Sequence, residues 1–431
     1  MRLGLIAEVV VDICILQLPF KHTRSATFQT YQPSSTMKIV IAPDSFKESL
    51  SAAEVATQIE AGFREIFPDF QYQRLPIADG GEGTVDALFE AISGQRRQVT
   101  VSDPLGRPVQ AEYAILSNGT GVIEMAAASG LHLVAPHERD PRITSSRGTG
   151  ELIVDALSVG VRHFIVGIGG SATNDGGAGL LQALGVRLVD SKGADLASGG
   201  AVLSQLAHID QTRADPRLKE CYFEVACDVD NPLIGGNGAT AVFGPQKGAT
   251  PQMIAELDEA LGNFAAVIKR DLDADVRSLP GSGAAGGLGA ALIGVLHARL
   301  RPGIEIVCEA MRVADAVQEA DLVVTGEGCI DGQTARGKAP VGIAKIASQF
   351  GVPVIAIGGA VAGSADKVYA NGIDAVFPSV QRACSIEQAF QDAAVNVRTT
   401  ARNTAAVLSI GAHTFGKIVQ ALPSRESRLT R

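Results

Sequence analysis

Acidic residues in glycine-rich loops are the side chains of this sequence best suited to chemistry. Eight of them stand where a short apolar run ends, at positions Asp44, Asp79, Glu82, Asp175, Asp228, Asp230, Glu327 and Asp331. Carboxylates hold Mg²⁺ and orient an acceptor hydroxyl in enzymes that transfer phosphoryl groups. Aspartate and glutamate beside glycine also favour turns and helix caps, which explains each residue when it is taken alone. Their repeated position at strand ends favours a shared site.

Groups that could bind phosphate occur in the same loops. Lys47 and Lys338 supply positive charge. The hydroxyls and glycines that could contact phosphate or substrate are Ser45, Thr149, Gly170, Ser171, Thr173, Gly286 and Gly287. Backbone amides of glycine-rich loops bind phosphate oxygens. Taken singly, each lysine is equally explained as a solvated side chain, and each hydroxyl as a helix cap.

Two stretches come close to known nucleotide-binding patterns. Residues 167–172 match G-x-G-x-x-A, and Asp190 lies where an NAD-binding unit has its acidic residue. Residues 171–175 separate this turn from the next helix, which suits phosphate or metal contacts better than a dinucleotide turn. Residues 332–339 are one residue short of a P-loop, with Ala339 where Mg²⁺ needs Ser or Thr. This second loop could still contact a phosphate through its amides and its lysine.

Short apolar strands that alternate with amphipathic helices are expected to position these loops. Strands are predicted at 38–42, 163–168, 222–226, 321–325 and 352–357. Ser51 and Glu54 form a capping-box pattern at the start of a helix. Residues 98–126 differ, because strand-like runs broken by turn residues predict antiparallel hairpins there. Ligands of open α/β sheets bind beyond the carboxyl ends of the strands, so the loops are expected to converge.

The predicted fold class is α/β with two domains. One is a doubly wound parallel-sheet domain, Rossmann- or flavodoxin-like, built from both chain ends, and the other is an inserted mixed α/β domain. The predicted ranges are 37–97 plus 284–421 for the first domain and 98–283 for the second. Residues 422–431 are expected to be a disordered tail.

The first 36 residues are expected to be an extension outside the fold. Their apolar run contains Glu8 and Asp12, which a secretory leader or a membrane span tolerates poorly. A globular pattern begins at Met37.

The charge and the cysteines limit the class of protein. A formal net charge of −9 argues against a general surface for nucleic acid or anionic membrane. The six cysteines include no C-x-x-C pair, and the seven histidines form no zinc-binding cluster. This pattern favours reduced thiols in a cytoplasmic protein. The expected partners are small molecules, and a homodimer is compatible with the sequence.

Taken in order, the loops resemble the bacterial glycerate kinase family (type-1 group). The resemblance runs from residue 37 to about 422 and rests on APDSFKESLSAAEVA, PIADGGEGT, TSSRGTGEL, GIGGSATNDGGAG, CDVDNPL, FGPQKGA, PGSGAAGGLGAAL and DLVVTGEGCIDGQTARGK. Any one segment is weak, whereas the ordered set is specific. The resemblance implies two α/β domains and the phosphorylation of D-glycerate by ATP with Mg²⁺. It favours 2-phosphoglycerate over 3-phosphoglycerate as the product.

A mechanism can be hypothesised from the residues, because phosphoryl transfer mainly needs positioning and charge neutralisation. Lys47 and Lys338, with the amides of 169–177 and 283–289, would hold the phosphates and the glycerate carboxylate. Asp331 is expected to contact substrate or phosphate as well.

The predicted carboxylates have separate roles in this hypothesis. Asp175 and Asp228 would hold Mg²⁺, and Asp79 or Asp44 would orient the acceptor hydroxyl. Two other functions stay open from the sequence: an NAD-dependent oxidoreductase that uses 167–172 and Asp190, and a non-catalytic ligand sensor of the same fold.

Overall fold

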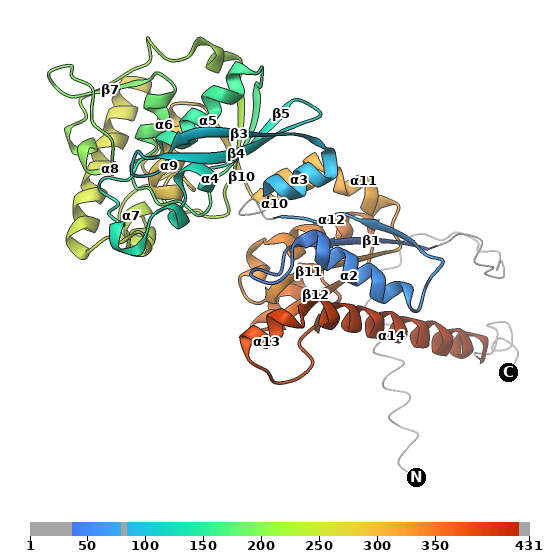
Figure 1. Cartoon of the computed structure of the whole chain (residues 1–431). Helices are drawn as coiled ribbons and strands as arrows, with labels where there is room; N and C mark the ends of the chain where they lie inside the picture. Colours follow the sequence, from blue (N-terminus) through green and yellow to red (C-terminus); the bar gives the residue numbers. More distant parts are fainter. Residues whose placement is uncertain (1–36, 79–83, 422–431) are drawn as a thin grey trace, which may run out of the picture. The chain divides into compact units, whose positions relative to one another are not determined.

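The first sheet of the protein is parallel and is built from segments far apart in the chain. The computed structural model describes residues 37–78 and 84–421. Five strands lie in the order β13-β12-β11-β1-β2. Figure 1 labels β1, β11 and β12 of this sheet. Their bounds are β1 (Lys38–Pro43), β2 (Gln71–Arg74), β11 (Leu322–Ile330), β12 (Val354–Val361) and β13 (Ala375–Pro378). All four pairings are parallel, as the alternating strand and helix pattern predicted.

Helices cover both faces of this sheet, because successive residues of each strand point to opposite sides. Ile39 and Ile41 of β1 share a core with α2 and α14, whereas Val40 and Ala42 share a second core with the other helices. The first pair of helices is α2 (Ala52–Arg64) and α14 (Ala393–Ala421). The second set is α3 (Thr84–Ile92), α10 (Gly303–Ala310), α11 (Val313–Gln318) and α12 (Ala339–Phe350). The predicted doubly wound architecture is confirmed for this sheet.

The start of α2 and its contact with α14 follow directly from the sequence. Ser51 Oγ accepts from the Glu54 amide at 3.2 Å, and the Glu54 carboxylate accepts from the Ser51 amide at 2.8 Å, so the predicted capping box is confirmed. Farther along α2, a Cβ on Gly62 would lie 2.3 Å from the Arg398 carbonyl oxygen. Glycine at this position therefore permits the close approach of α2 and α14.

The second sheet is mixed and has the order β10-β9-β6-β5-β4-β3. Its strands are β3 (Gly94–Ser102), β4 (Pro108–Leu116), β5 (Thr120–Glu124), β6 (His163–Gly167), β9 (Tyr222–Ala226) and β10 (Arg299–Arg301). β3, β4 and β5 pair antiparallel, which confirms the hairpins predicted for 98–126. β5, β6, β9 and β10 pair parallel. A separate antiparallel pair consists of β7 (Arg187–Val189) and β8 (His208–Asp210).

The remaining helices pack mainly on the second sheet. They are α4 (Ala126–Ser129), α5 (Arg147–Ser158), α6 (Ala178–Ala183), α7 (Ala239–Phe243), α8 (Pro251–Leu272) and α9 (Ala284–Gly294), and α13 (Ile386–Gln391) precedes α14. Short 3₁₀ turns are η1 (Leu131–Leu133), η2 (Pro136–Glu138), η3 (Ala201–Gln205), η4 (Pro216–Glu220), η5 (Pro245–Lys247), η6 (Thr334–Arg336) and η7 (Ala365–Asn371). Within the described residues, no helix is long and apolar enough to cross a membrane.

The division into two domains at the predicted residues stays a prediction. β10 lies beyond the predicted boundary at 283/284 and pairs with β9 of the second sheet. Several residues of α9 belong to the core of that sheet as well, among them Leu288 and Leu292.

Candidate functional site

A cavity of about 430 Å³ opens where four strands of the first sheet end. Asp44 follows β1, Glu327 lies near the end of β11, Gly359 lies in β12, and Ser379 follows β13, and all four line this cavity. The volume is within the range of small-molecule sites. The structure brings five of the predicted site residues into its lining: Asp44, Ser45, Lys47, Asp331 and Lys338.

The loop after β1 supplies one side of the cavity. The Asp44 amide donates to the Gly326 carbonyl at 2.8 Å, which ties the end of β1 to β11. The Asp44 carboxylate is buried and accepts from the Ser45 amide at 2.6 Å. Phe46 and Leu50 then close a tight turn through a backbone bridge, and Lys47 is exposed within it. This arrangement fixes the carboxylate and leaves the lysine free to move onto an anion.

The end of β11 and the segment that follows it supply further charged residues to the cavity lining. Glu327 is 5% exposed and accepts a short hydrogen bond from the Thr334 hydroxyl. Its second oxygen lies 3.8 Å from Lys338 Nζ, at the N-cap of α12. Asp331 accepts from the amides of Gln333 and Thr334 at 2.7 and 3.2 Å, which holds the loop in a tight turn. Residues 332–339, one residue short of a P-loop, therefore belong to a strand–loop–helix unit with Lys338 at the start of the helix.

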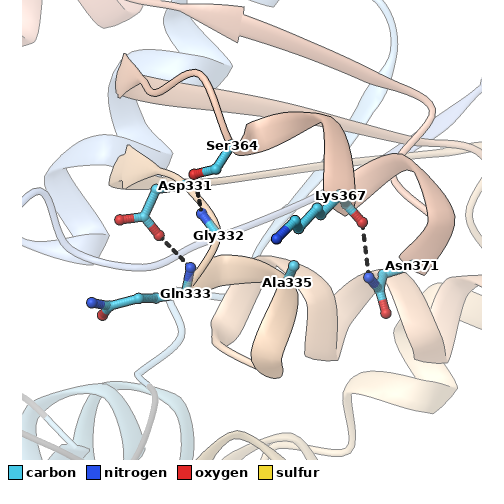
Figure 2. A pocket seen from close by; sticks show the side chains of 7 residues that line it. All are labelled: Asp331, Gly332, Gln333, Ala335, Ser364, Lys367 and Asn371. Atoms are coloured by element: carbon cyan, nitrogen blue, oxygen red, sulfur yellow. Dashed lines mark hydrogen bonds between the residues drawn. The ribbon is translucent and has the colours of Figure 1, made fainter.

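A more open cavity of about 580 Å³ adjoins the first one at Asp331. Figure 2 shows its lining, where the Gly332 amide donates to Ser364 Oγ at 2.8 Å. Lys367 lines this cavity and is exposed. The residues that line this second cavity come from the loop after β11, from η6 and from η7 with the residue before it. A ligand bound in the first cavity could therefore extend along this surface.

Asp175, predicted as a metal ligand, lies in the second sheet's loops and is fully buried. It accepts from the amides of Ser146, Gly177 and Gly179 at 2.8–3.1 Å and from the Ser146 hydroxyl at 2.8 Å. Both carboxylate oxygens are therefore satisfied by the protein. This pattern organises the starts of α5 and α6, and the metal-binding role stays a prediction.

The predicted glycine-rich loops 169–177 and 283–289 pack against each other. The Gly176 amide donates to the Gly286 carbonyl at 3.0 Å. A Cβ on Gly286 would lie 2.0 Å from the Thr173 carbonyl oxygen, and Gly287 has φ +90°. These glycines serve close backbone contact, and phosphate binding by either loop stays a prediction.

Thr149 and Ser171, two further predicted site residues, also lie outside the lining of the 430 Å³ cavity. Thr149 was expected to cap a helix, but α5 begins at Arg147 with Ser146 as its N-cap, so that capping assignment is wrong. Thr149 is buried in the first turn, 2.8 Å from the Ser129 hydroxyl. Gly170 precedes Ser171 in an exposed position and accepts from the Leu131 amide at 2.8 Å.

Lys247 is a buried charged residue that sequence reasoning missed. It ends η5, is 1% exposed, and donates to Ser171 Oγ at 2.8 Å and to the Thr173 carbonyl at 2.7 Å. Burial lowers the pKa of Lys247 to about 7, and the negative charge of Asp175 opposes that shift. Nothing in the sequence around FGPQKGA distinguishes this lysine from a solvated one. Its contacts fix the 171–173 segment.

Two of the remaining predicted carboxylates, Asp228 and Asp230, do not line the 430 Å³ cavity. Asp228 follows β9, is exposed, and accepts from the Gly303 amide at 3.0 Å. Asp79 and Glu82 lie outside the described residues. Within 37–78 and 84–421, no three His, Cys, Asp or Glu side chains gather as a metal site. Magnesium in kinases is held largely by phosphate oxygens and water, with one or two carboxylates.

The NAD-binding alternative fails on the geometry of its turn. β6 ends at Gly167, but α6 begins only at Ala178, so the turn does not lead directly into a helix. Asp190 follows β7 of the separate two-stranded sheet and accepts from the amides of Lys192 and Ala194. Both features contradict the dinucleotide fingerprint.

Comparisons with known proteins agree with the family resemblance that the ordered loop sequences carry. A profile of the glycerate kinase family matches residues 39–409. Glycerate 2-kinase of Escherichia coli K12 and glycerate kinase of Bacillus subtilis 168 are each 53% identical, over 88% of this chain and their whole length. A crystal structure described as a glycerate kinase 2 from Salmonella typhimurium LT2 is 56% identical, with a TM-score of 0.81 over 88% of this chain and all of that chain. The chain therefore belongs to the glycerate kinase family.

Proposed function

We propose that the protein transfers the γ-phosphoryl group of ATP to D-glycerate, and that the 430 Å³ cavity is its active site. The observation that carries this placement is the meeting of two lysines with three carboxylates where the first sheet's strands end: Lys47, Lys338, Asp44, Glu327 and Asp331. Lysines neutralise phosphate charge, and carboxylates serve the metal and the acceptor hydroxyl. The 2-hydroxyl is the proposed acceptor, because a relative of 53% identity carries the name glycerate 2-kinase.

The roles of the side chains follow from their exposure. Lys47 is exposed and Lys338 is about one-third exposed (35%), so both can approach phosphate oxygens without unfolding the loop. Glu327, held by Thr334 and near Lys338, orients that lysine before the nucleotide arrives. Asp44, fixed at the end of β1, would accept a hydrogen bond from the acceptor hydroxyl.

Magnesium is part of the proposal, and the cavity's donor set fits it. One or two of the lining carboxylates Asp44, Glu327 and Asp331 would hold the ion together with phosphate oxygens and water. When bound, the ion would neutralise charge on the transferring phosphoryl group. Asp175 lies outside this cavity lining and is fully buried.

The test measures ADP release with Mg²⁺, ATP and D-glycerate, and adds enolase alone to identify the phosphoglycerate product. Direct conversion by enolase is expected for a 2-phosphate product. A requirement for phosphoglycerate mutase would instead mean transfer to the 3-hydroxyl, and absence of glycerate-dependent ADP would leave the ligand-sensor alternative.

The placement of the active site is tested by Lys338→Met. A fall in kcat/KM of about 100-fold is expected, because removing a charge that stabilises the transition state has effects of that size. Lys345→Met is the matched control, since Lys345 is exposed on the same helix outside the cavity lining. Equal activity of both variants would refute the placement.

We also propose that the enzyme acts in the cytoplasm on small molecules alone. The five cysteines of the described ranges are free thiols: Cys221, Cys227, Cys308, Cys329 and Cys384. Free thiols are typical of proteins in a reducing compartment.

A further inference from the structure

Part of the lining of the 430 Å³ cavity is apolar, and half of this apolar part comes from α13. We call this apolar part the apolar wall: Phe46, Val380, Ile386, Ala389, Phe390 and Ala393. Ile386 and Phe390 are four residues apart on α13, so they share one face of the helix. They are 68% and 39% exposed. Two large, exposed apolar side chains in the lining of a cavity that also holds charged residues indicate a ligand with an apolar part.

The same cavity is also lined by charged residues. Lys47 lies in the loop after β1, Glu327 lies in β11, and Lys338 is the N-cap of α12. A ligand that fills the whole cavity must therefore have an anionic end and a flat or apolar end. Glycerate has three carbons, all bearing oxygen, and gains little from an apolar wall. ATP has both ends, because its triphosphate is joined through ribose to a purine ring.

We propose that the apolar wall receives the purine ring of ATP, with the exposed ring of Phe390 as the aromatic surface and Ile386 beside it. This inference rests on the proposed active site and names its nucleotide subsite. The phosphates then extend toward Lys47 and Lys338, and the glycerate subsite lies beyond them, away from α13. Aromatic side chains stack on bases without needing a fixed set of hydrogen bonds.

The test compares Phe390→Ala and Ile386→Ala with controls of equal exposure on other helices. Phe350, 40% exposed at the end of α12, matches Phe390, and Ile410, 65% exposed on α14, matches Ile386. Phe390→Ala is expected to raise the KM for ATP about 10-fold, since base stacking on an aromatic ring has effects of that order. Ile386→Ala should raise it less, and the KM for D-glycerate should not change. Phe350→Ala and Ile410→Ala should leave both constants unchanged.

Inorganic tripolyphosphate separates this inference from the proposed active site, because it has phosphates but no base. The inhibition constant of tripolyphosphate should be unchanged in Phe390→Ala and higher in Lys338→Met, because the lysine variant binds the phosphates more weakly. An unchanged KM for ATP in both wall variants, with Lys338→Met still impaired, would overturn the purine subsite and keep the active site. A rise in the KM for glycerate instead would assign the wall to the acceptor and also overturn it. Full activity in all three variants would remove both proposals.

Discussion

Lys247 offers a stability measurement whose sign is fixed by its burial. Its ammonium group is enclosed near 171–173, with a pKa lowered from 10.5 to about 7. In the unfolded chain the pKa returns to its ordinary value. Between pH 7 and 10.5 the unfolded state thus binds more protons, and the free energy of unfolding rises with pH. Below pH 7 both states are protonated, and the destabilisation is at its maximum.

The magnitude follows from the two pKa values. One pKa unit corresponds to 1.36 kcal/mol, and integration from pH 7 to pH 9 gives a gain of about 2 kcal/mol from this side chain. Lys247→Met keeps a similar shape without the titrating group. The variant also leaves Ser171 Oγ and the Thr173 carbonyl without their donor, which costs about 1–3 kcal/mol for each buried group. The cost of these lost bonds changes little with pH.

The assay is urea unfolding of the wild type and Lys247→Met at pH 7 and pH 9. The difference in unfolding free energy between the two proteins should change by about 2 kcal/mol, in favour of the wild type at pH 9. Lys269→Met is the control, because Lys269 is 52% exposed and its difference should not depend on pH in this way. Parallel pH profiles for wild type and Lys247→Met would refute the buried, perturbed ammonium group.

Three further changes test the organisation of the loops. Asp175→Ala removes the acceptor of four buried hydrogen bonds and should lower the unfolding free energy by at least about 3 kcal/mol in urea. Gly286→Ala forces a Cβ to 2.0 Å from the Thr173 carbonyl at φ +66°, so calorimetry should show a Tm several degrees lower, and an unchanged Tm would contradict the close contact. Cys329 and Cys384 are both exposed, but Cys329 lines the cavity, where desolvation and the charges of Asp331 and Glu327 raise its pKa. Alkylation of Cys329 by iodoacetamide should be slow and blocked by ATP, whereas Cys384, outside the cavity lining, should react equally with and without ATP.

Local patterns predicted the elements well because they depend on neighbours in the sequence. The capping box of Ser51 and Glu54 needs only residues three apart, and the hairpins of 98–126 need only turn residues between short strands. The convergence of loops after β1 and β11 also followed, since parallel neighbours end at the same edge of a sheet. The expected helix start at Thr149 failed by a few residues, because Ser146 precedes it and is held by Asp175.

The sequence could not separate carboxylates that line a cavity from those that are enclosed by the protein. Asp44 and Asp175 each follow a strand beside small polar residues, yet one lines a cavity and the other is enclosed by Ser146, Gly177 and Gly179. The partners of Asp175 include a residue 29 positions away, which no local pattern reveals. Lys247 was missed for the same reason, since its partners are more than 70 residues distant.

Exposure to solvent therefore separates the lysines of the cavity, Lys47 and Lys338, from the buried Lys247 and Asp175. A group that binds and releases a charged nucleotide must exchange water for phosphate in each turnover, as exposed Lys47 and partly exposed Lys338 can do. Lys247 and Asp175 are sealed among their own partners and would first have to break buried hydrogen bonds. Substitution at Lys338 should thus change kcat/KM at nearly constant unfolding free energy, whereas substitution at Asp175 should change the unfolding free energy first. The opposite ranking would place the reacting phosphates on the glycine-rich loops of the second sheet.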